Sequence, residues 1–257
     1  MRNKASRLRV FLAVPALLLA AACGGGSDSG EEPGAEADRA RNGLKESGPV
    51  LSTAQLEKAI IAEGELKGFT VEPPGAAEED ETEGEEGDAD EPSEAEWRPA
   101  PKAKADRAEC ASILVAGVER PIKDTRNVTR RTLRPVAGAK PGQSVSVALL
   151  ATRGGSVELL RDLKAAVPKC ADGFEVSAEG ETSRYSEISP ADAHTTGDET
   201  MAYTATVDGK DSEWALKVVV ARAGSTVAVF VGSGADGKPA DLPQSLLDKQ
   251  LAKLAKA

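Results

Sequence analysis

Helical spacing of apolar residues recurs in four segments between residues 49 and 257. Each segment carries leucine, isoleucine, valine or alanine at intervals of three and four, which is typical of a helix with one buried face. Ser52 or Thr53 is expected to cap the first helix and Ser156 the third, and Pro168 is expected to end the third. The predicted helices cover residues 52–64, 101–117, 156–168 and 242–257.

Extended patterns fill most of the remaining chain. β-Branched residues in partial alternation, separated by turns that contain glycine and aspartate, indicate strands. The turn sequences "DGKD" and "RAGS" separate the last three strands, so these are expected to form an antiparallel meander. The extended segments are residues 69–72, 125–136, 143–153, 173–179, 182–188, 199–207, 212–223 and 225–233.

Together these elements predict an α+β fold, with an antiparallel sheet of about six strands packed with three to four helices. Aromatic residues make up only 3% of the chain, so valine, leucine, isoleucine and alanine must form the core. The C-terminal helix places Leu247, Leu251 and Leu254 on one face. We expect this face to dock on the sheet rather than on a membrane or a partner.

The first 22 residues have the pattern of a secretory signal peptide. Four basic residues, with no acidic one, precede an apolar run that ends in three alanines before Cys23. The run is shorter than the roughly 20 residues that a membrane-spanning helix needs. Cleavage directed by Ala20 and Ala22 would release a soluble product, which is one of two processing routes that fit these residues.

The second route is lipidation. The sequence "LAAAC" at residues 19–23 resembles a bacterial lipobox, in which the cysteine is acylated and becomes the new N-terminus. Ala20 stands where lipoboxes usually carry leucine, and Leu19 is one position further back. Polar residues rich in glycine and serine follow Cys23 and suit a flexible tether. We expect lipid on Cys23 to hold the chain on the outer face of the cell membrane.

The chain has three cysteines, Cys23, Cys110 and Cys170. An exported chain with an odd number of cysteines leaves one thiol to explain. If Cys23 carries lipid, Cys110 and Cys170 remain as a pair in an oxidising compartment, where disulfides persist. A disulfide between them is therefore expected, and two buried free thiols are the alternative.

Charge is distributed unevenly along the chain. Loss of the four basic charges of the signal peptide takes the formal charge from −10 to −14. Residues 78–96 hold twelve acidic residues and no basic one, whereas residues 97–257 hold 23 basic and 20 acidic residues. Such an acidic block cannot bury enough apolar surface to order, so we expect a solvated, disordered insert. The functional alternative is binding of calcium or of a basic partner, although the spacing of an EF-hand loop is missing.

The expected order of parts follows from these patterns. It is a lipoprotein signal peptide (1–22), a flexible tether (23–48), a helix and strand of the folded domain (49–72), the acidic insert (73–96) and the main α+β domain (97–257). No basic, aromatic-interleaved surface points to nucleic acid, so no nucleic-acid partner is expected. We expect the protein to be a monomer.

Little in the sequence points to catalysis or metal binding. The single histidine, His194, lies in an expected loop near Asp192, Asp198 and Glu199, but no Gly-x-Ser-x-Gly elbow presents a nucleophile. One histidine and two paired cysteines are too few for a metal site. No glycine-rich loop opens a helix as a nucleotide-binding fingerprint requires. We therefore expect no enzyme, no catalytic residue, no metal and no cofactor.

One expected strand gathers four arginines, Arg126, Arg130, Arg131 and Arg134. They form either a surface for an anionic lipid or glycan, or a solvated face of the strand, which is the commoner case.

The order of elements, with "AAVPKC" at residues 165–170 and "GDETMAY" at residues 197–203, resembles a family of actinobacterial lipoproteins. These share the pattern of the extracellular sensor domain of PknH-type kinases. The resemblance spans about residues 49–257 without the acidic insert. It implies a ligand-sensing or envelope-binding module. The sensor domains are thought to have a second disulfide and a cleft between sheet and helices, and this chain lacks the cysteines for the second bridge.

Two functions fit this description. The first is a lipid-anchored module that binds or senses a small molecule or another component of the cell envelope, and it requires a cavity. The alternative is an envelope lipoprotein that acts through protein–protein contacts, with a filled core and no ligand pocket.

Overall fold

The computed structural model describes residues 48–72, 103–117, 124–136, 143–178, 180–208, 213–235 and 237–257. The expected signal peptide, the lipidation site Cys23, the tether up to residue 47 and the acidic insert lie outside the described residues. All the elements below belong to one compact unit, Asn42–Ala257.

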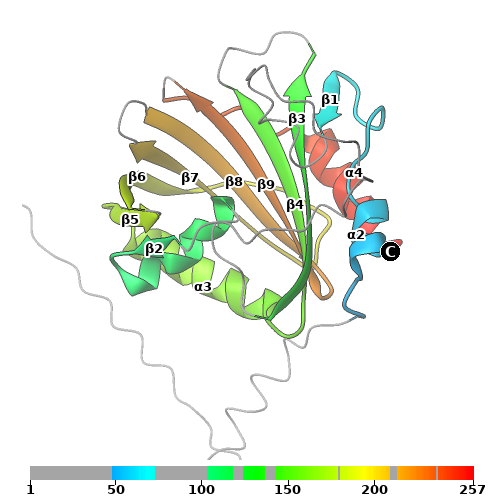
Figure 1. The fold of residues 1–257 in the computed structure, drawn as a ribbon, viewed down its shortest axis with the longest axis horizontal. Coiled ribbons are helices and arrows are strands. Elements are labelled where there is room, and N and C mark those ends of the chain that lie inside the picture. The colour runs from blue at the N-terminus through cyan, green and yellow to red at the C-terminus, as the bar shows by residue number, and fades with distance from the viewer. Residues whose placement is uncertain are drawn as a thin grey trace, which may run out of the picture. The chain divides into compact units, whose positions relative to one another are not determined.

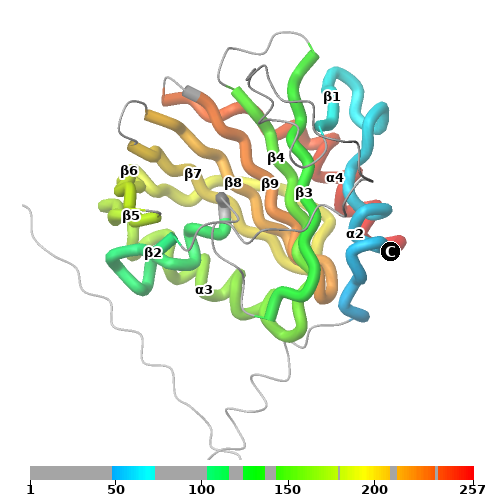
Figure 2. The backbone as a smooth tube through the Cα atoms, viewed as in Figure 1, coloured from blue at the N-terminus to red at the C-terminus, as the bar shows by residue number. Residues whose placement is uncertain are grey.

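Nine strands of the described residues form one antiparallel sheet, in the order β1-β3-β4-β9-β8-β7-β6-β5-β2 (Figure 1). Strands β5 to β9 follow one another as a meander, which confirms and extends the arrangement expected for the last three (Figure 2). The earlier β4 pairs with β9, and β3 pairs with β4. The strands are β1 (Phe69–Glu72), β2 (Lys104–Ala105), β3 (Thr125–Pro135), β4 (Ser144–Thr152), β5 (Phe174–Ala178), β6 (Glu181–Ala191), β7 (Glu199–Asp208), β8 (Glu213–Ala223) and β9 (Thr226–Ala235).

The expected strand number of about six is therefore wrong. The four-residue β1 coincides with the short strand expected at residues 69–72, whereas the two-residue β2 lies inside the segment expected to form the second helix and is too short to show a sequence period. Each pairs with a longer neighbour, β1 with β3 and β2 with β5. Both are edges of the sheet, and very short edge strands limit edge-to-edge association.

Both faces of the sheet are apolar at its centre. In β8, Val218 and Val220 point to one face while Val219 and Ala221 point to the other, and all four are buried. The 3₁₀ helix η1 and α3 cover the first face, and α2 and α4 cover the second. The sheet thus lies between two helical layers, which explains why its central strands read as nearly continuous apolar runs.

The number of helices among the described residues agrees with the three to four expected. None of them is both long enough and apolar enough to cross a membrane. They are α2 (Thr53–Ala59), η1 (Ala108–Gly117), α3 (Ser156–Lys169) and α4 (Gln244–Leu254).

Helix ends follow the sequence signals only in part. Ser52 caps α2 as expected, through a capping box. For α3 the N-cap is Gly155 and not Ser156, whose hydroxyl instead donates to the Gly224 carbonyl (3.4 Å) in the turn between β8 and β9. Pro168 lies inside the last turn of α3 and does not end it. A tertiary contact has replaced the local cap.

The α-helix expected at residues 101–117 is wrong, because this segment forms β2 and the 3₁₀ helix η1. The Cys110 N–H donates to the Arg107 carbonyl (3.0 Å), an i to i−3 hydrogen bond. Cys110 is also held by a disulfide, and the Ile113 carbonyl accepts a hydrogen bond from the Tyr203 hydroxyl (2.8 Å). These tertiary contacts compete with the α-helical pattern.

Side chains of α4 tie this helix to the segment that contains α2. Gln250 is fully buried; its amide accepts from the Ile61 N–H and donates to the Ala59 carbonyl, both at 2.8 Å. Lys253 pairs with Glu65 (2.6 Å). The first and last elements of the domain therefore form one layer. The apolar face of α4 is buried as expected, with Leu247, Leu251 and Leu254 in the core.

Candidate functional site

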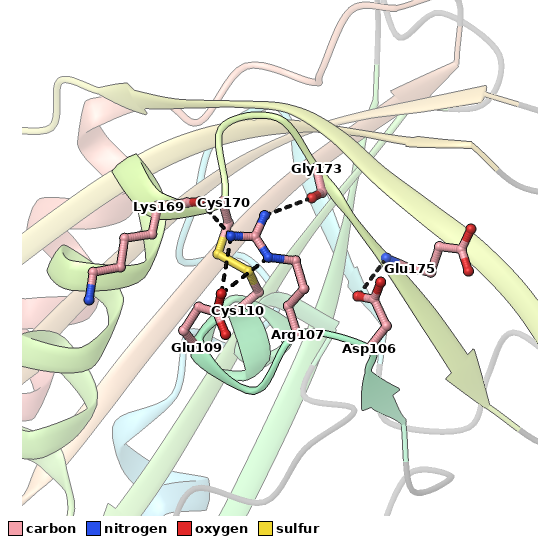
Figure 3. Close-up of a disulfide and its surroundings, with 8 residues drawn as sticks. All are labelled: Asp106, Arg107, Glu109, Cys110, Lys169, Cys170, Gly173 and Glu175. Atoms are coloured by element: carbon pink, nitrogen blue, oxygen red, sulfur yellow. Dashed lines mark hydrogen bonds and ion pairs between the residues drawn. A yellow bond between two sulfur atoms is a disulfide. The ribbon is translucent and has the colours of Figure 1, made fainter.

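The expected disulfide joins Cys110 of η1 to Cys170 at the C-terminal end of α3 (Figure 3). The two sulfur atoms are 2.00 Å apart, and both cysteines are fully buried. The alternative of two free thiols therefore does not describe this structure. The bond fixes η1 to α3 on one face of the sheet.

Arg107 reinforces the disulfide with hydrogen bonds to the end of α3 (Figure 3). Its guanidinium donates to the carbonyls of Lys169 (2.9 Å) and Gly173 (3.3 Å) and pairs with Glu109 (3.1 Å). The hydrogen bond from its own backbone N–H, and then the one from Arg107, lowers the pKa of Glu109 below its ordinary value. Since these contacts join η1 to α3, we interpret the cluster as a brace of the fold.

The segment "GDETMAY" has a structural role at each end. A Cβ at Gly197 would lie 2.8 Å from the Arg222 carbonyl oxygen, so the close approach favours glycine. Tyr203 is fully buried, and its hydroxyl donates to the Ile113 carbonyl. Burial, followed by the neighbouring Tyr185, raises the pKa of Tyr203 well above its ordinary value. Tyr203 therefore stays a protonated donor at neutral pH.

Four charged side chains connect α3 with the turn between β8 and β9. Asp198 Oδ2 accepts from the Gly224 N–H (2.8 Å) and from Arg222 Nη1 (3.2 Å). Arg222 Nε lies 3.8 Å from Glu199 Oε2, and Glu199 also binds Lys164 of α3 (2.6 Å). Arg222 is buried, and its Nε has no hydrogen-bond partner among the described residues. Two cations and two carboxylates thus balance each other.

A hollow of about 400 Å³ lies where four distant parts of the chain meet. Its lining residues come from four segments, which are residues 48–51 without Val50, the loop 196–198, the β8–β9 turn at 223–226, and the end of α4 at 251–257 without Lys253 and Lys256. We call it the tether-side hollow, because residue 48 is the end of the expected tether.

Hydrogen bonds hold one wall of the tether-side hollow in place. The Ser225 hydroxyl donates to the Pro49 carbonyl (2.6 Å), and the Thr152 N–H donates to the Ser225 carbonyl (2.9 Å). Asn127 Nδ2 donates to the Leu51 carbonyl (2.7 Å). The segment that leads into the domain is therefore fastened across the ends of β3, β4 and β9, and the hollow is preformed.

The lining of the tether-side hollow is mostly apolar. Leu51, Leu251 and Leu254 supply its large side chains, and Asp198 is its one charged side chain among the described residues. Mostly apolar walls with a few placed polar groups are typical of small-molecule sites.

A second, more open hollow of about 400 Å³ lies between α3 and strands β6 and β7. Lys164, Val167 and Pro168 line it from α3, and residues 190–193 and 200–202 line it from the strands and the loop between them. Lys164, its one basic side chain among these residues, is already bound to Glu199.

His194 lies in an exposed loop, where its backbone carbonyl accepts from Gln244 Nε2 (2.7 Å). The carboxylates of Asp198 and Glu199 pair with basic side chains and not with His194. In the part of the chain that the structure describes, no group of three or more His, Cys, Asp and Glu side chains is placed to hold a metal ion. Among the described residues, His194 therefore forms no ion pair with the carboxylates of Asp198 and Glu199.

Arg131 and Arg134 of β3 pair with acidic side chains within the domain. Arg134 pairs with Glu72 of β1 (2.5 Å), and Arg131 pairs with Glu57 of α2. Burial favours a higher pKa for Glu57, but the hydrogen bonds from Thr129 and Arg131, with the charge of Arg131, outweigh it and lower the pKa. These pairs connect β3 to its neighbours, which agrees with a structural role for this strand.

Sequence reasoning missed most of the tether-side hollow. Its walls come from segments up to about 200 residues apart, and none of them carries a local motif for binding. Only the segment "GDETMAY" drew attention to Gly197 and Asp198.

No protein-family model matches the sequence, and no curated protein matches it either. Among solved structures, the fold is similar to the extracellular domain of PknH from Mycobacterium tuberculosis, with a TM-score of 0.41 and 11% sequence identity. The match covers 61% of this chain and 77% of that chain. The likeness is a distant structural one.

Proposed function

We propose that the protein is an extracytoplasmic lipoprotein, anchored by lipid on Cys23, whose folded domain binds or senses a small molecule or another component of the cell envelope. The signal-peptide pattern and the lipobox-like sequence support the anchor. The tether-side hollow is the observation that carries the binding function, because it is preformed, mostly apolar and furnished with one charged group.

The position of the hollow suits an anchored protein. Gly48 and Pro49 line it; Gly48 is the last residue of the expected tether, and Pro49 is the first residue after it. A flexible coil over residues 24–48 would have an r.m.s. reach of about 25–30 Å. The tether would therefore hold the hollow close to the membrane surface, where it could take up a ligand from the cell envelope.

The anchor is tested by Cys23→Ser. This variant should leave the membrane fraction and appear in the soluble exported fraction, whereas the matched control Ser27→Ala should stay with the membrane. Fractionation without detergent shows where each variant is found, and mass analysis of the N-terminal peptide shows whether it carries lipid. Retention of the Cys23→Ser variant in the membrane fraction would show that the anchor lies elsewhere.

The binding function is tested by native mass spectrometry of the chain purified from an actinobacterial host. We expect a defined adduct that leaves on denaturation. Ala252→Leu places a larger side chain in the wall of the hollow and should abolish the adduct. The matched control Ala165→Leu, at an exposed position of α3 outside both hollows, should keep it. A clean mass for the wild-type chain, or an adduct that survives Ala252→Leu, contradicts the proposed site.

The second candidate is a lipoprotein that acts through protein–protein contacts. The observation that favours it is that the core layers on both faces of the sheet are filled. Both hollows lie outside these layers and are open to solvent, so neither is an enclosed ligand cavity. In that case native mass spectrometry should show the chain without a bound adduct, and cross-linking in cells should recover a protein partner. In either case we propose a monomer without enzymatic activity.

A further inference from the structure

We infer that the tether-side hollow takes ligands that carry a cationic group, such as an ammonium, on a small apolar body. The inference rests on the proposed binding function and names its ligand class.

Asp198 lines the hollow, and only one of its two carboxylate oxygens is engaged in contacts within the described part of the domain. Its hydrogen bonds from the Gly224 N–H (2.8 Å) and Arg222 Nη1 (3.2 Å) both reach Oδ2. Oδ1 has no partner among the described residues, and 48% of the side chain is exposed. The carboxylate is thus held in one orientation, with an acceptor left for a ligand. A hydrogen bond from an ammonium to a carboxylate is among the stronger ones in proteins.

The two basic side chains near Asp198, those of Arg222 and Lys164, already pair with carboxylates of the domain. Arg222 contacts Asp198 and Glu199, and Lys164 pairs with Glu199. Neither Arg222 nor Lys164 lines the tether-side hollow. A ligand in the hollow therefore contacts the carboxylate of Asp198 and not the cations behind it.

The C-terminal end of α4 also favours a cationic ligand in the tether-side hollow. Ala252, Leu254 and the C-cap Ala255 line the hollow. The last carbonyls of an α-helix carry partial negative charge, which favours a nearby cation. Lys253, the basic residue of this turn, is turned towards Glu65 (2.6 Å) and does not line the hollow.

The apolar walls determine the rest of the ligand. Leu51, Leu251 and Leu254 are almost fully buried, so their exposed edges form a fixed apolar surface. A volume of about 400 Å³ is near the lower end for small-molecule sites. It suits a short alkyl chain or a single ring.

Three probes that differ only in their head group test the charge preference. They are n-octylammonium, n-octanol and n-octanoate, each used below the concentration at which it aggregates. The full chain with Cys23→Ser, labelled with ¹⁵N, is titrated by NMR, and the amide signals of Gly197, Gly224 and Ala255 report on the hollow. We expect n-octylammonium to bind about tenfold more tightly than n-octanol, and n-octanoate to bind most weakly.

Two variants identify the group responsible. Asp198→Asn should remove the tenfold preference, whereas Asp192→Asn, at an exposed aspartate of the other hollow, should keep it. Asp198 also accepts hydrogen bonds from the β8–β9 turn, so Asp198→Asn could disturb that turn as well as the charge. A third variant therefore leaves Asp198 and its contacts unchanged. Ala252→Leu narrows the hollow from α4 and should abolish binding of all three probes.

The outcomes separate this inference from the proposed function. Equal binding of n-octylammonium and n-octanol, both lost in Ala252→Leu, overturns the ligand class and leaves the binding function standing. A preference for n-octanoate overturns the ligand class in the same way. If no probe binds, the ligand class is overturned, and the native mass spectrum decides the binding function independently.

Discussion

The buried amide of Gln250 can be removed by Gln250→Met, which keeps an unbranched side chain of similar length. In the wild-type domain this amide accepts from the Ile61 N–H and donates to the Ala59 carbonyl, both at 2.8 Å. It is fully buried between α4 and the segment that follows α2. The variant therefore loses two hydrogen bonds without leaving a large cavity.

The loss can be estimated from these contacts. Two buried backbone groups, the Ala59 carbonyl and the Ile61 N–H, lose their partner, at about 1–3 kcal/mol each. Burying an apolar side chain in place of the Gln250 amide recovers about 1–2 kcal/mol. With central values of about 4 kcal/mol lost and about 1.5 kcal/mol recovered, we expect a net loss of about 2.5 kcal/mol in the free energy of unfolding. For a domain of this size that corresponds to roughly 5–10 °C in Tm.

Urea denaturation followed by far-UV circular dichroism measures this loss. The matched control is Gln244→Met, which changes an exposed glutamine of the same helix and should shift stability by less than about 0.5 kcal/mol. Hydrogen exchange adds a local test, since the Ile61 amide should exchange faster in Gln250→Met. If Gln250→Met is as stable as Gln244→Met and the Ile61 amide stays protected, the assignment of this bridge is refuted.

Contacts elsewhere in the domain lead to three more expected outcomes. Reduction of the Cys110–Cys170 disulfide should lower the free energy of unfolding by about 4 kcal/mol, because the bond joins positions 60 residues apart. Urea titrations with and without reductant measure this, and an unchanged midpoint contradicts it. Tyr203→Phe removes the donor of the buried Ile113 carbonyl and should cost about 1–2 kcal/mol. In the wild-type chain, alkaline titration should show that Tyr203 ionises only on unfolding, and an ordinary titration of Tyr203 would argue against its burial. Although burial favours a higher pKa for Glu57, its hydrogen bonds and a neighbouring guanidinium lower that pKa. Its stabilising contribution is therefore complete above its ordinary pKa and is lost as the pH falls through the lowered value. Glu57→Gln should therefore reduce the loss of unfolding free energy between neutral and acidic pH, as measured by urea titrations at several pH values. If the pH dependence is the same as in the wild-type chain, Glu57 does not have the lowered pKa.

Many elements of the fold were predictable from local sequence. The apolar positions of α4 and the long apolar runs of β8 and β9 show which side chains are buried, because burial imposes the period of the element on the sequence. With Cys23 assigned to lipid, the cysteine count favoured a disulfide between Cys110 and Cys170, and the structure contains this bond.

The wrong predictions have a common cause. Ser156 was expected to cap α3, but its hydroxyl contacts Gly224, 68 positions further along the chain. The segment at residues 108–117 was expected to be α-helical, but the disulfide and the hydroxyl of Tyr203 hold it as a 3₁₀ helix. In each case a long-range contact outweighed the local preference.

The sequence by itself determined the signal-peptide pattern, the position of the acidic block, the α+β class and most of the elements, because each depends on neighbouring residues. Only the tertiary structure decided that η1 and α3 cover one face of the sheet while α2 and α4 cover the other. Tertiary structure also brought residues 48–51, 196–198, 223–226 and 251–257 together around Asp198. The strand order sets which distant segments meet at one end of the sheet, and local periodicity does not encode that order.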